Sequence, residues 1–241
     1  MIEKSKGIVL HNLKYTDSGV VVQMYTLKSG RQSFLIRGMR KKNSGKKSAL
    51  LQPLFILDLE LYYRKSRDMQ VVRDFSVSYS PADIFANIKK TSVAMFLGEV
   101  LTSVLREESP NRDLFTFLED SIIYFDRCRD NFANFHIAFL AGLGSYLGFE
   151  PRSATGTDDI YFDMINGAFV PAPPLHGSYA GREISGILAA FFSSSFENCS
   201  NISLNGALRN EVLGTLMNYY SIHLPGLKKI RSLDVLKEVY G

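Results

Sequence analysis

The chain has 241 residues, of which 46% are hydrophobic and 22% charged, so it is long enough for one large globular domain or two small ones. We expect neither a secretory signal peptide nor a membrane helix. The two cysteines, Cys128 and Cys199, indicate neither a disulfide framework nor a metal site, and this low cysteine content fits a reducing cytoplasm. The net charge of +4 is unevenly distributed along the chain. Residues 1–80 contain 15 Lys and Arg against 6 Asp and Glu, whereas residues 81–241 contain 13 against 18. This asymmetry indicates a nucleic-acid or membrane-surface module joined to a part with another role.

The first 80 residues contain short segments that are rich in β-branched and aromatic residues and separated by turn signals. We predict five strands from these segments, at about 5–14, 19–27, 31–38, 54–64 and 70–78. Five consecutive short strands are typical of a small closed barrel of the OB type, although periodicity alone does not separate it from other small barrels. The first predicted domain is therefore an OB-fold over residues 1–80.

The third predicted strand has an arginine-bearing face. Alternation places Phe34 and Ile36 on one side of the strand and Arg31, with Arg37, on the other. We expect the arginine face to be the outer one and to face nucleic acid. In the second strand either Gln23 with Tyr25 or Met24 could point outward. Tyr25 is a candidate platform for stacking a base.

A dense basic run follows the third predicted strand, with six cations in the eleven residues from Arg37 to Lys47. A solvated, mobile loop is one interpretation of such a run. The other is a contact surface for a polyanion, because lysine and arginine bind phosphates without reading sequence. The candidate DNA contacts are Arg31, Arg37, Arg40, Lys41, Lys42, Lys46, Lys47 and Tyr25.

After residue 80 the apolar spacing becomes helical, so the fold class is α+β. We predict a second, mainly helical domain over residues 81–241. Its helices are expected at about 81–108, from about 110 to at least 125, and at about 131–148, 181–196, 205–223 and 232–239. Gly, Pro, Thr and Asp dominate a stretch within about 150–180, which predicts an irregular or small β insertion with strand-like pieces at 160–162 and 168–170.

Enzyme motifs do not stand out, and we expect a protein that is not an enzyme. A rival hypothesis is a metal-dependent nucleic-acid enzyme that uses Asp158, Asp159 and Asp163, although these carboxylates do not follow the EF-hand spacing. A third is an interaction adaptor whose basic loop docks an acidic partner or a membrane surface.

Short strings along the chain together carry a likeness to a known family. In the N-terminal part they are Gly7-Ile8-Val9-Leu10-His11, Tyr15-Thr16-Asp17-Ser18, Tyr25-Thr26, Ser29-Gly30-Arg31, Arg37-Gly38-Met39-Arg40 and Leu51-Gln52-Pro53. In the later part they are Gly98-Glu99-Val100-Leu101, Leu114-Phe115, Phe135-His136-Ile137, Gly181-Arg182-Glu183-Ile184 and Arg231-Ser232-Leu233-Asp234-Val235-Leu236. On these strings the chain resembles the RecO family, bacterial mediators of recombination, and the resemblance covers essentially the whole chain.

This resemblance implies an OB-fold that binds single- and double-stranded DNA and a protein that anneals complementary strands. It implies RecR and the single-stranded DNA-binding protein SSB as partners, with RecA loading as the outcome. It also implies a bacterial cytoplasmic protein that associates with the nucleoid during repair and needs no cofactor.

The sequence departs from the family in two places. Many relatives carry a four-cysteine zinc module in the region of residues 150–180, where this chain has no cysteine, so we expect a metal-free insertion. Basic residues that help some relatives hold the acidic tail of SSB are replaced by Ala133 and Asn134. The remaining candidate partner-binding residues are Arg127, Arg129, Phe132, Phe135 and Phe139, and core packing is the alternative for the three phenylalanines.

Overall fold

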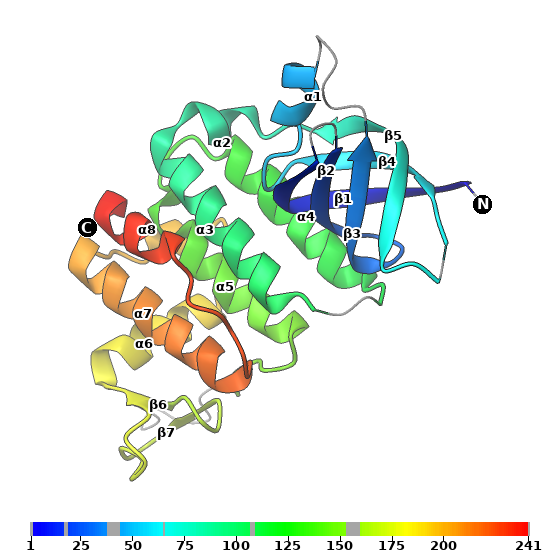
Figure 1. Cartoon of the computed structure of the whole chain (residues 1–241). Helices are drawn as coiled ribbons and strands as arrows, with labels where there is room; N and C mark the ends of the chain where they lie inside the picture. Colours follow the sequence, from blue (N-terminus) through cyan, green and yellow to red (C-terminus); the bar gives the residue numbers. More distant parts are fainter. Residues whose placement is uncertain are drawn as a thin grey trace. The chain divides into compact units, whose positions relative to one another are not determined.

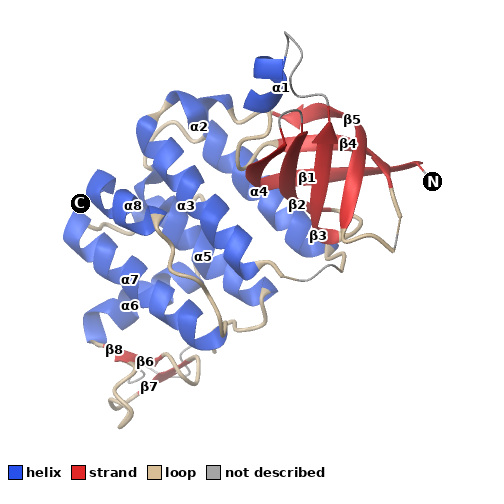
Figure 2. Cartoon of the chain, in the orientation of Figure 1, coloured by secondary structure: helices blue, strands red, loops and turns tan. Residues whose placement is uncertain are grey.

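The computed structural model describes residues 2–16, 19–37, 44–64, 66–106, 109–152 and 160–240, and for residues 14–16 and 44–46 the backbone alone (Figures 1 and 2). The fold is α+β, as predicted. The chain divides into two compact units, one formed by Met1–Arg127 with Ile230–Leu233, the other by Cys128–Lys229 with Asp234–Gly241. The first unit thus contains helices as well as strands, and a domain boundary at residue 80 stays a prediction.

Five strands of the first unit close into a barrel, and all five were predicted. They are β1 (Ile2–Thr16), β2 (Gly19–Thr26), β3 (Gly30–Arg37), β4 (Ile56–Tyr62) and β5 (Met69–Tyr79). Their order around the barrel is β1-β2-β3-β5-β4, in which β3 and β5 are parallel and every other pair is antiparallel. This is the arrangement of an OB-type barrel.

The barrel interior is filled by aliphatic side chains and a few aromatic ones. Phe34 and Ile36 of β3 are buried at 0% and 4% exposure, which confirms the predicted inner face of that strand. Leu57 and Leu59 of β4 complete the same cluster from the opposite wall. Burying side chains of this size stabilises a fold by roughly 1.5–3 kcal/mol each, so this cluster accounts for a large part of the barrel's stability.

Three helices follow the barrel within the first unit: α2 (Ala82–Ala86), α3 (Ile88–Val104) and α4 (Arg112–Arg127). The prediction of one helix over 81–108 was wrong, because Asn87 adopts an extended backbone with φ −116° and ψ 118°. Its side-chain oxygen accepts hydrogen bonds from the N–H groups of Lys89 and Lys90, so it caps α3 and ends α2. Ile88 and Met95 belong to the apolar spacing from which that helix was predicted, yet they are 78% and 57% exposed.

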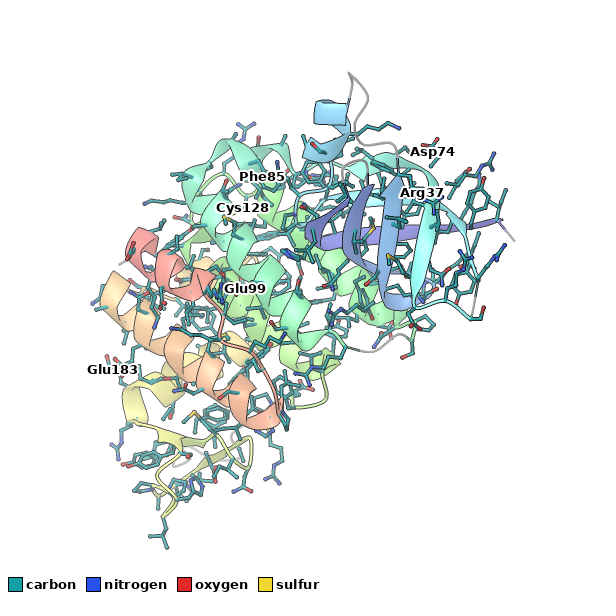
Figure 3. The ribbon with its side chains drawn as sticks, in the orientation of Figure 1. Arg37, Asp74, Phe85, Glu99, Cys128 and Glu183 are labelled. Atoms are coloured by element: carbon teal, nitrogen blue, oxygen red, sulfur yellow. The ribbon has the colours of Figure 1, made fainter. Side chains whose placement is uncertain are left out.

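Helix α3 packs closely on the barrel at Gly98. A β-carbon at this position would lie 2.9 Å from the β-carbon of Pro53 and 3.4 Å from the carbonyl oxygen of Leu10. The absence of a side chain at Gly98 therefore allows the close contact between helix and barrel. Glu99, the next residue, caps the start of α8 (Ser232–Tyr240) by accepting hydrogen bonds from the N–H groups of Arg231 and Ser232 at 2.9 and 2.8 Å (Figure 3).

The second unit is mainly helical, with one small sheet. Its helices are η1 (Phe132–Asn134), α5 (Phe135–Tyr146), α6 (Arg182–Phe192), η2 (Cys199–Asn201) and α7 (Gly206–His223), together with most of α8. The sheet has the order β7-β6-β8, from β6 (Tyr161–Asp163), β7 (Ala168–Val170) and β8 (Tyr179–Ala180). It forms the predicted insertion and includes both predicted strand-like pieces. Among the helices that the structure describes, none has the length and apolar character to cross a membrane.

Hydrogen bonds around Asp163 hold the insertion together. Its carboxylate accepts from the N–H groups of Ile165 and Asn166 and from the Asn166 side chain, and lies 3.2 Å from Nε2 of His176. Burial alone would raise the pKa of Asp163, but these hydrogen bonds outweigh it and lower that pKa. Asp158 and Asp159 lie outside the described residues, and within those residues no group of three or more His, Cys, Asp and Glu is placed to hold a metal.

Candidate nucleic-acid interface

The basic run ends in a short helix, α1 (Ser44–Ala49), that was not predicted. The chain after it is fixed to the barrel, because Leu51 is 1% exposed in the barrel core and its carbonyl accepts a hydrogen bond from Nδ2 of Asn12 at 2.6 Å. The C-terminal end of the run is therefore anchored to the barrel. The predicted contacts Arg40, Lys41 and Lys42 lie outside the described residues, and Lys46 is placed by its backbone only.

Lys47 projects from α1 toward β5. Its side chain is 59% exposed, its Nζ lies 4.0 Å from a carboxylate oxygen of Asp74, and the same atom lies 5.5 Å from the centre of the Phe75 ring. An ion pair between such exposed groups contributes only about 0–1 kcal/mol, so this pair does not prevent Lys47 from contacting a phosphate.

Arg37 is the last residue of β3 and is exposed (Figure 3). It pairs in register with Gly19, the first residue of β2. Arg37 is therefore an accessible cation at the end of the strand from which the basic run continues.

Arg31 lies on the outer face of β3, as predicted, but a helix end covers it. Its Nη1 donates a hydrogen bond to the carbonyl of Leu105 at 2.8 Å, and its Nη2 donates to the side chain of Gln23 at 3.1 Å. Leu105 is the residue that ends α3. A cation at the negative end of a helix stabilises it, so Arg31 joins the barrel to α3 in addition to its predicted phosphate contact.

The prediction that Tyr25 stacks on a base was wrong. Its side chain is only 3% exposed, and its ring stacks on that of Phe115 in α4 with the centroids 6.5 Å apart. Because α4 covers this part of β2, a nucleotide base has no access to the ring. Part of the β2–β3 face, where OB-folds commonly bind oligonucleotides, is thus occupied by the chain's own helices.

A groove of about 500 Å³ lies on another part of the barrel, along β1, β4 and β5. It is lined by Lys4, Ser5, Lys6, Leu27, Lys28, Asp58, Leu59, Glu60, Asp74, Phe75 and Ser76. Nζ of Lys4 lies 3.2 Å from a carboxylate oxygen of Glu60, and Nζ of Lys6 lies 2.7 Å from a carboxylate oxygen of Glu119 in α4. Because its cations and carboxylates are balanced, this groove is a poorer match for a phosphate chain than the basic run.

The predicted partner-binding phenylalanines lie mostly in the core. Phe135 and Phe139 are each 2% exposed. The Phe135 ring packs against the rings of Phe139 and Phe196, with centroid distances of 6.1 and 5.2 Å. These two rings therefore do not form an open groove for a partner, and they pack in the core, which is the alternative given for them from the sequence. Phe132 is partly buried in η1, and Arg127 and Arg129 are exposed.

Asn134 is also buried. Its Nδ2 donates to the carbonyls of Cys199 and Ile202 at 3.0 and 2.7 Å, and its Oδ1 accepts from Nε of Arg209 at 3.0 Å. Nearby His136 is completely buried, and this burial, with the charge of Arg209, lowers the pKa of His136 to about 3. This region of the second unit is thus a packed interior in which His136 is neutral and Arg209 is held by the Asn134 side chain.

Sequence reasoning did not identify two exposed cations, Arg64 and Arg67, in the connection between β4 and β5. The signal was present in the string Arg64-Lys65-Ser66-Arg67, which spans the end of the fourth predicted strand and the break after it. A run of three cations in four residues next to a predicted strand could have indicated a second basic surface.

Two family models match the chain. Residues 1–80 match the model described as "Recombination protein O N terminal", and residues 86–157 match "Recombination protein O C terminal". Together they cover the barrel, the helices α3 to α5 and the start of the insertion.

Full-length relatives give the same result. The chain is 39% identical to the DNA repair protein RecO of Bacteroides fragilis, 36% identical to that of Phocaeicola vulgatus and 32% identical to that of Porphyromonas gingivalis. Each match covers 100% of this chain and 100% of the relative. The chain therefore belongs to the RecO family of bacterial DNA repair proteins.

Proposed function

We propose that this protein is a non-enzymatic mediator of recombinational DNA repair. It binds single- and double-stranded DNA through the barrel, anneals complementary strands and, with RecR, helps RecA load onto DNA coated with SSB. The observation that carries the proposal is the basic run from Arg37 to Lys47, attached at its end to a five-stranded barrel through Leu51. Membership of a family of DNA repair proteins supports the same reading.

Annealing requires the mutual repulsion of two phosphate backbones to be lowered. Lysine and arginine do this by displacing condensed counterions from the DNA, and they need no particular base sequence. Six cations in eleven residues supply a high local charge for this purpose. The proposed phosphate contacts are Arg31, Arg37, Arg40, Lys41, Lys42, Lys46 and Lys47.

Binding is expected to be independent of sequence. Phosphate contacts position DNA but carry no direct sequence information. Tyr25, the aromatic residue considered for contact with a base, is buried beneath α4. The barrel is therefore proposed to hold either strand of any sequence, as an annealing protein must.

The acidic tail of SSB is proposed to meet the second half of the chain. With Phe135 and Phe139 in the core, the exposed cations Arg127 and Arg129 and the partly buried Phe132 are the remaining candidates to contact it. The protein is proposed to act in the cytoplasm, at the nucleoid during repair.

Fluorescence anisotropy with a labelled single strand over a salt series tests the DNA site. The test variant changes Lys41, Lys42, Lys46 and Lys47 to Ala, and a matched control changes the exposed residues Arg112, Arg182, Lys228 and Lys229 to Ala. Each phosphate contact contributes about −0.7 to the log-log slope, so loss of four contacts reduces its magnitude by up to about 3. Equal slopes for the test variant and the wild type would place the site elsewhere, and absence of wild-type binding at low salt would reject the function.

The same DNA, incubated with the protein and Mg²⁺, Mn²⁺ or Zn²⁺, tests the absence of catalysis. Intact strands under all three ions are expected. Cleavage that depends on the protein would favour the metal-dependent enzyme instead.

A further inference from the structure

The connection between β4 and β5 carries Arg64 and Arg67, whose backbone groups are held by hydrogen bonds from one buried side chain. Gln70, at the start of β5, is 1% exposed and reaches back into this turn. Its Oε1 accepts from the N–H of Arg64 at 2.9 Å, and its Nε2 donates to the carbonyls of Arg64 and Arg67 at 2.9 and 2.8 Å. A further hydrogen bond from the N–H of Arg67 to the carbonyl of Arg64, at 3.1 Å, closes the turn.

Both arginine side chains are exposed, whereas the side chain that orders their backbone is buried. Arg73, further along β5, forms an ion pair with Glu60, with Nη1 3.4 Å from a carboxylate oxygen. Within the described part of the chain, no such ion pair joins a carboxylate to Arg64 or Arg67. The backbone of Arg64 and of Arg67 is thus held in place while both side chains are exposed, and guanidinium groups are well suited to binding phosphate oxygens.

This turn and the basic run lie at different ends of the β3–β5 strand pair. Ser33 pairs with Met69 in the parallel register, and Arg37 lies four residues further along β3. At about 3.3 Å per residue, at least about 13 Å therefore separates the level of Arg37 from the level at which β5 begins. Figure 1 shows the β4–β5 connection at the opposite end of β5 from α1.

We propose that Arg64 and Arg67 form a second phosphate-binding site, which holds the second DNA strand while the basic run holds the first. The inference rests on the proposed annealing function and gives it a mechanism. Two strands bound to one surface repel each other, and separation along the barrel lowers that repulsion until the bases pair. Fixing the turn in advance also reduces the conformational entropy lost on binding.

The test is a titration of the full chain with an eight-nucleotide oligo(dT) at low salt, at concentrations well above its dissociation constant. Oligo(dT) cannot pair with itself, so the number of strands bound per chain is not altered by annealing. We expect two strands per chain for the wild type and one for the Arg64→Ala/Arg67→Ala variant. Relative to the wild type, the variant should bind the first strand with an affinity changed less than about twofold and the second strand with an affinity reduced roughly tenfold or more.

Two further variants sharpen the result. Lys228→Ala/Lys229→Ala removes the same charge from exposed positions in the other unit and is expected to bind two strands, as the wild type does. Gln70→Met keeps both arginines but removes three hydrogen bonds, and we expect it to weaken the second strand roughly threefold to tenfold.

The outcomes separate this inference from the function on which it rests. If the wild type binds one strand only, or the arginine variant still binds two, the second site is rejected while DNA binding stands. If the arginine variant loses affinity for the first strand instead, the turn belongs to the path of that strand and the second-strand role is rejected. If the wild type binds no oligo(dT), the proposed function fails together with the inference.

Discussion

The carboxylate of Asp126 accepts a hydrogen bond from the hydroxyl of Tyr79 at 2.8 Å, which joins α4 to the last residue of β5. Its second oxygen accepts from the N–H of Ile84 in α2, also at 2.8 Å, and Nζ of the buried Lys90 donates to the carbonyl of Asp126 at 2.9 Å. Burial, followed by the hydrogen bond with Asp126, raises the pKa of Tyr79 to about 12. One carboxylate therefore fixes how two helices meet the end of the barrel.

Removing this carboxylate should destabilise the first unit. Asp126→Ala leaves the buried N–H of Ile84 without its acceptor, which costs about 1–3 kcal/mol. Tyr79→Phe removes only one hydroxyl and is expected to cost about 1 kcal/mol. Urea unfolding followed by circular dichroism measures both, and a wild-type midpoint for Asp126→Ala would show that the hydrogen bonds contribute nothing.

The close contact at Gly98 predicts an unusual result for a helix glycine. Gly98→Ala places a β-carbon 2.9 Å from that of Pro53, so we expect a loss of about 1–3 kcal/mol from overpacking. Gly186→Ala, in α6, meets no atom within 4 Å and should instead stabilise by about 0.5–1 kcal/mol. Thermal unfolding compares the two, and a stabilised Gly98→Ala would contradict the packing of α3 on the barrel.

Arg31 and Lys47 should differ when stability and DNA binding are measured side by side. Arg31→Ala removes hydrogen bonds to Leu105 and Gln23, so the free energy of unfolding is expected to fall by about 1–2 kcal/mol. Lys47→Ala removes an exposed cation and should change stability by less than about 0.5 kcal/mol while weakening DNA binding. Equal stability of the two variants would show that Arg31 does not hold α3.

The burial of His136 predicts a loss of stability in mild acid. Its pKa in the folded chain is about 3, below the ordinary value of 6.5, so the unfolded chain binds the proton first. The stabilisation is complete above pH 6.5 and is lost as the pH falls toward 3, at about 1.4 kcal/mol per pH unit. Between pH 7 and pH 5 the wild type should lose about 2 kcal/mol more than His136→Gln. Parallel urea midpoints for the two proteins over this range would contradict the buried, neutral histidine.

The barrel could be predicted from sequence because alternation of buried and exposed residues is a local signal. Phe34 and Ile36 alternate with Ser33, Leu35 and Arg37, which are only partly buried or exposed, and each inner residue lies in the core as expected. The break at Asn87 was not predicted, because the apolar spacing runs on through α2 and α3 while a single side chain caps the second helix. A capping hydrogen bond of this kind does not change the periodic spacing of apolar residues from which helices are predicted.

The candidate site was predictable in composition but not in accessibility. Tyr25 and Arg31 lie on outward faces of their strands, and only the tertiary fold brings Phe115 and Leu105 over them. Conversely, nothing in the sequence sets Arg64 and Arg67 apart from other cations, because the hydrogen bonds from Gln70 depend on the folded hairpin. Which surface remains open is decided by long-range packing rather than by local sequence.

Annealing of complementary oligonucleotides, bare and coated with SSB, tests the central claim most directly. It is measured for the wild type and for the variant with Lys41, Lys42, Lys46 and Lys47 changed to Ala, across a salt series. We predict that the wild type anneals both substrates, faster at low salt, and that the variant anneals roughly tenfold more slowly or worse. Failure of the wild type to accelerate annealing of either substrate at any salt concentration would contradict the proposed function.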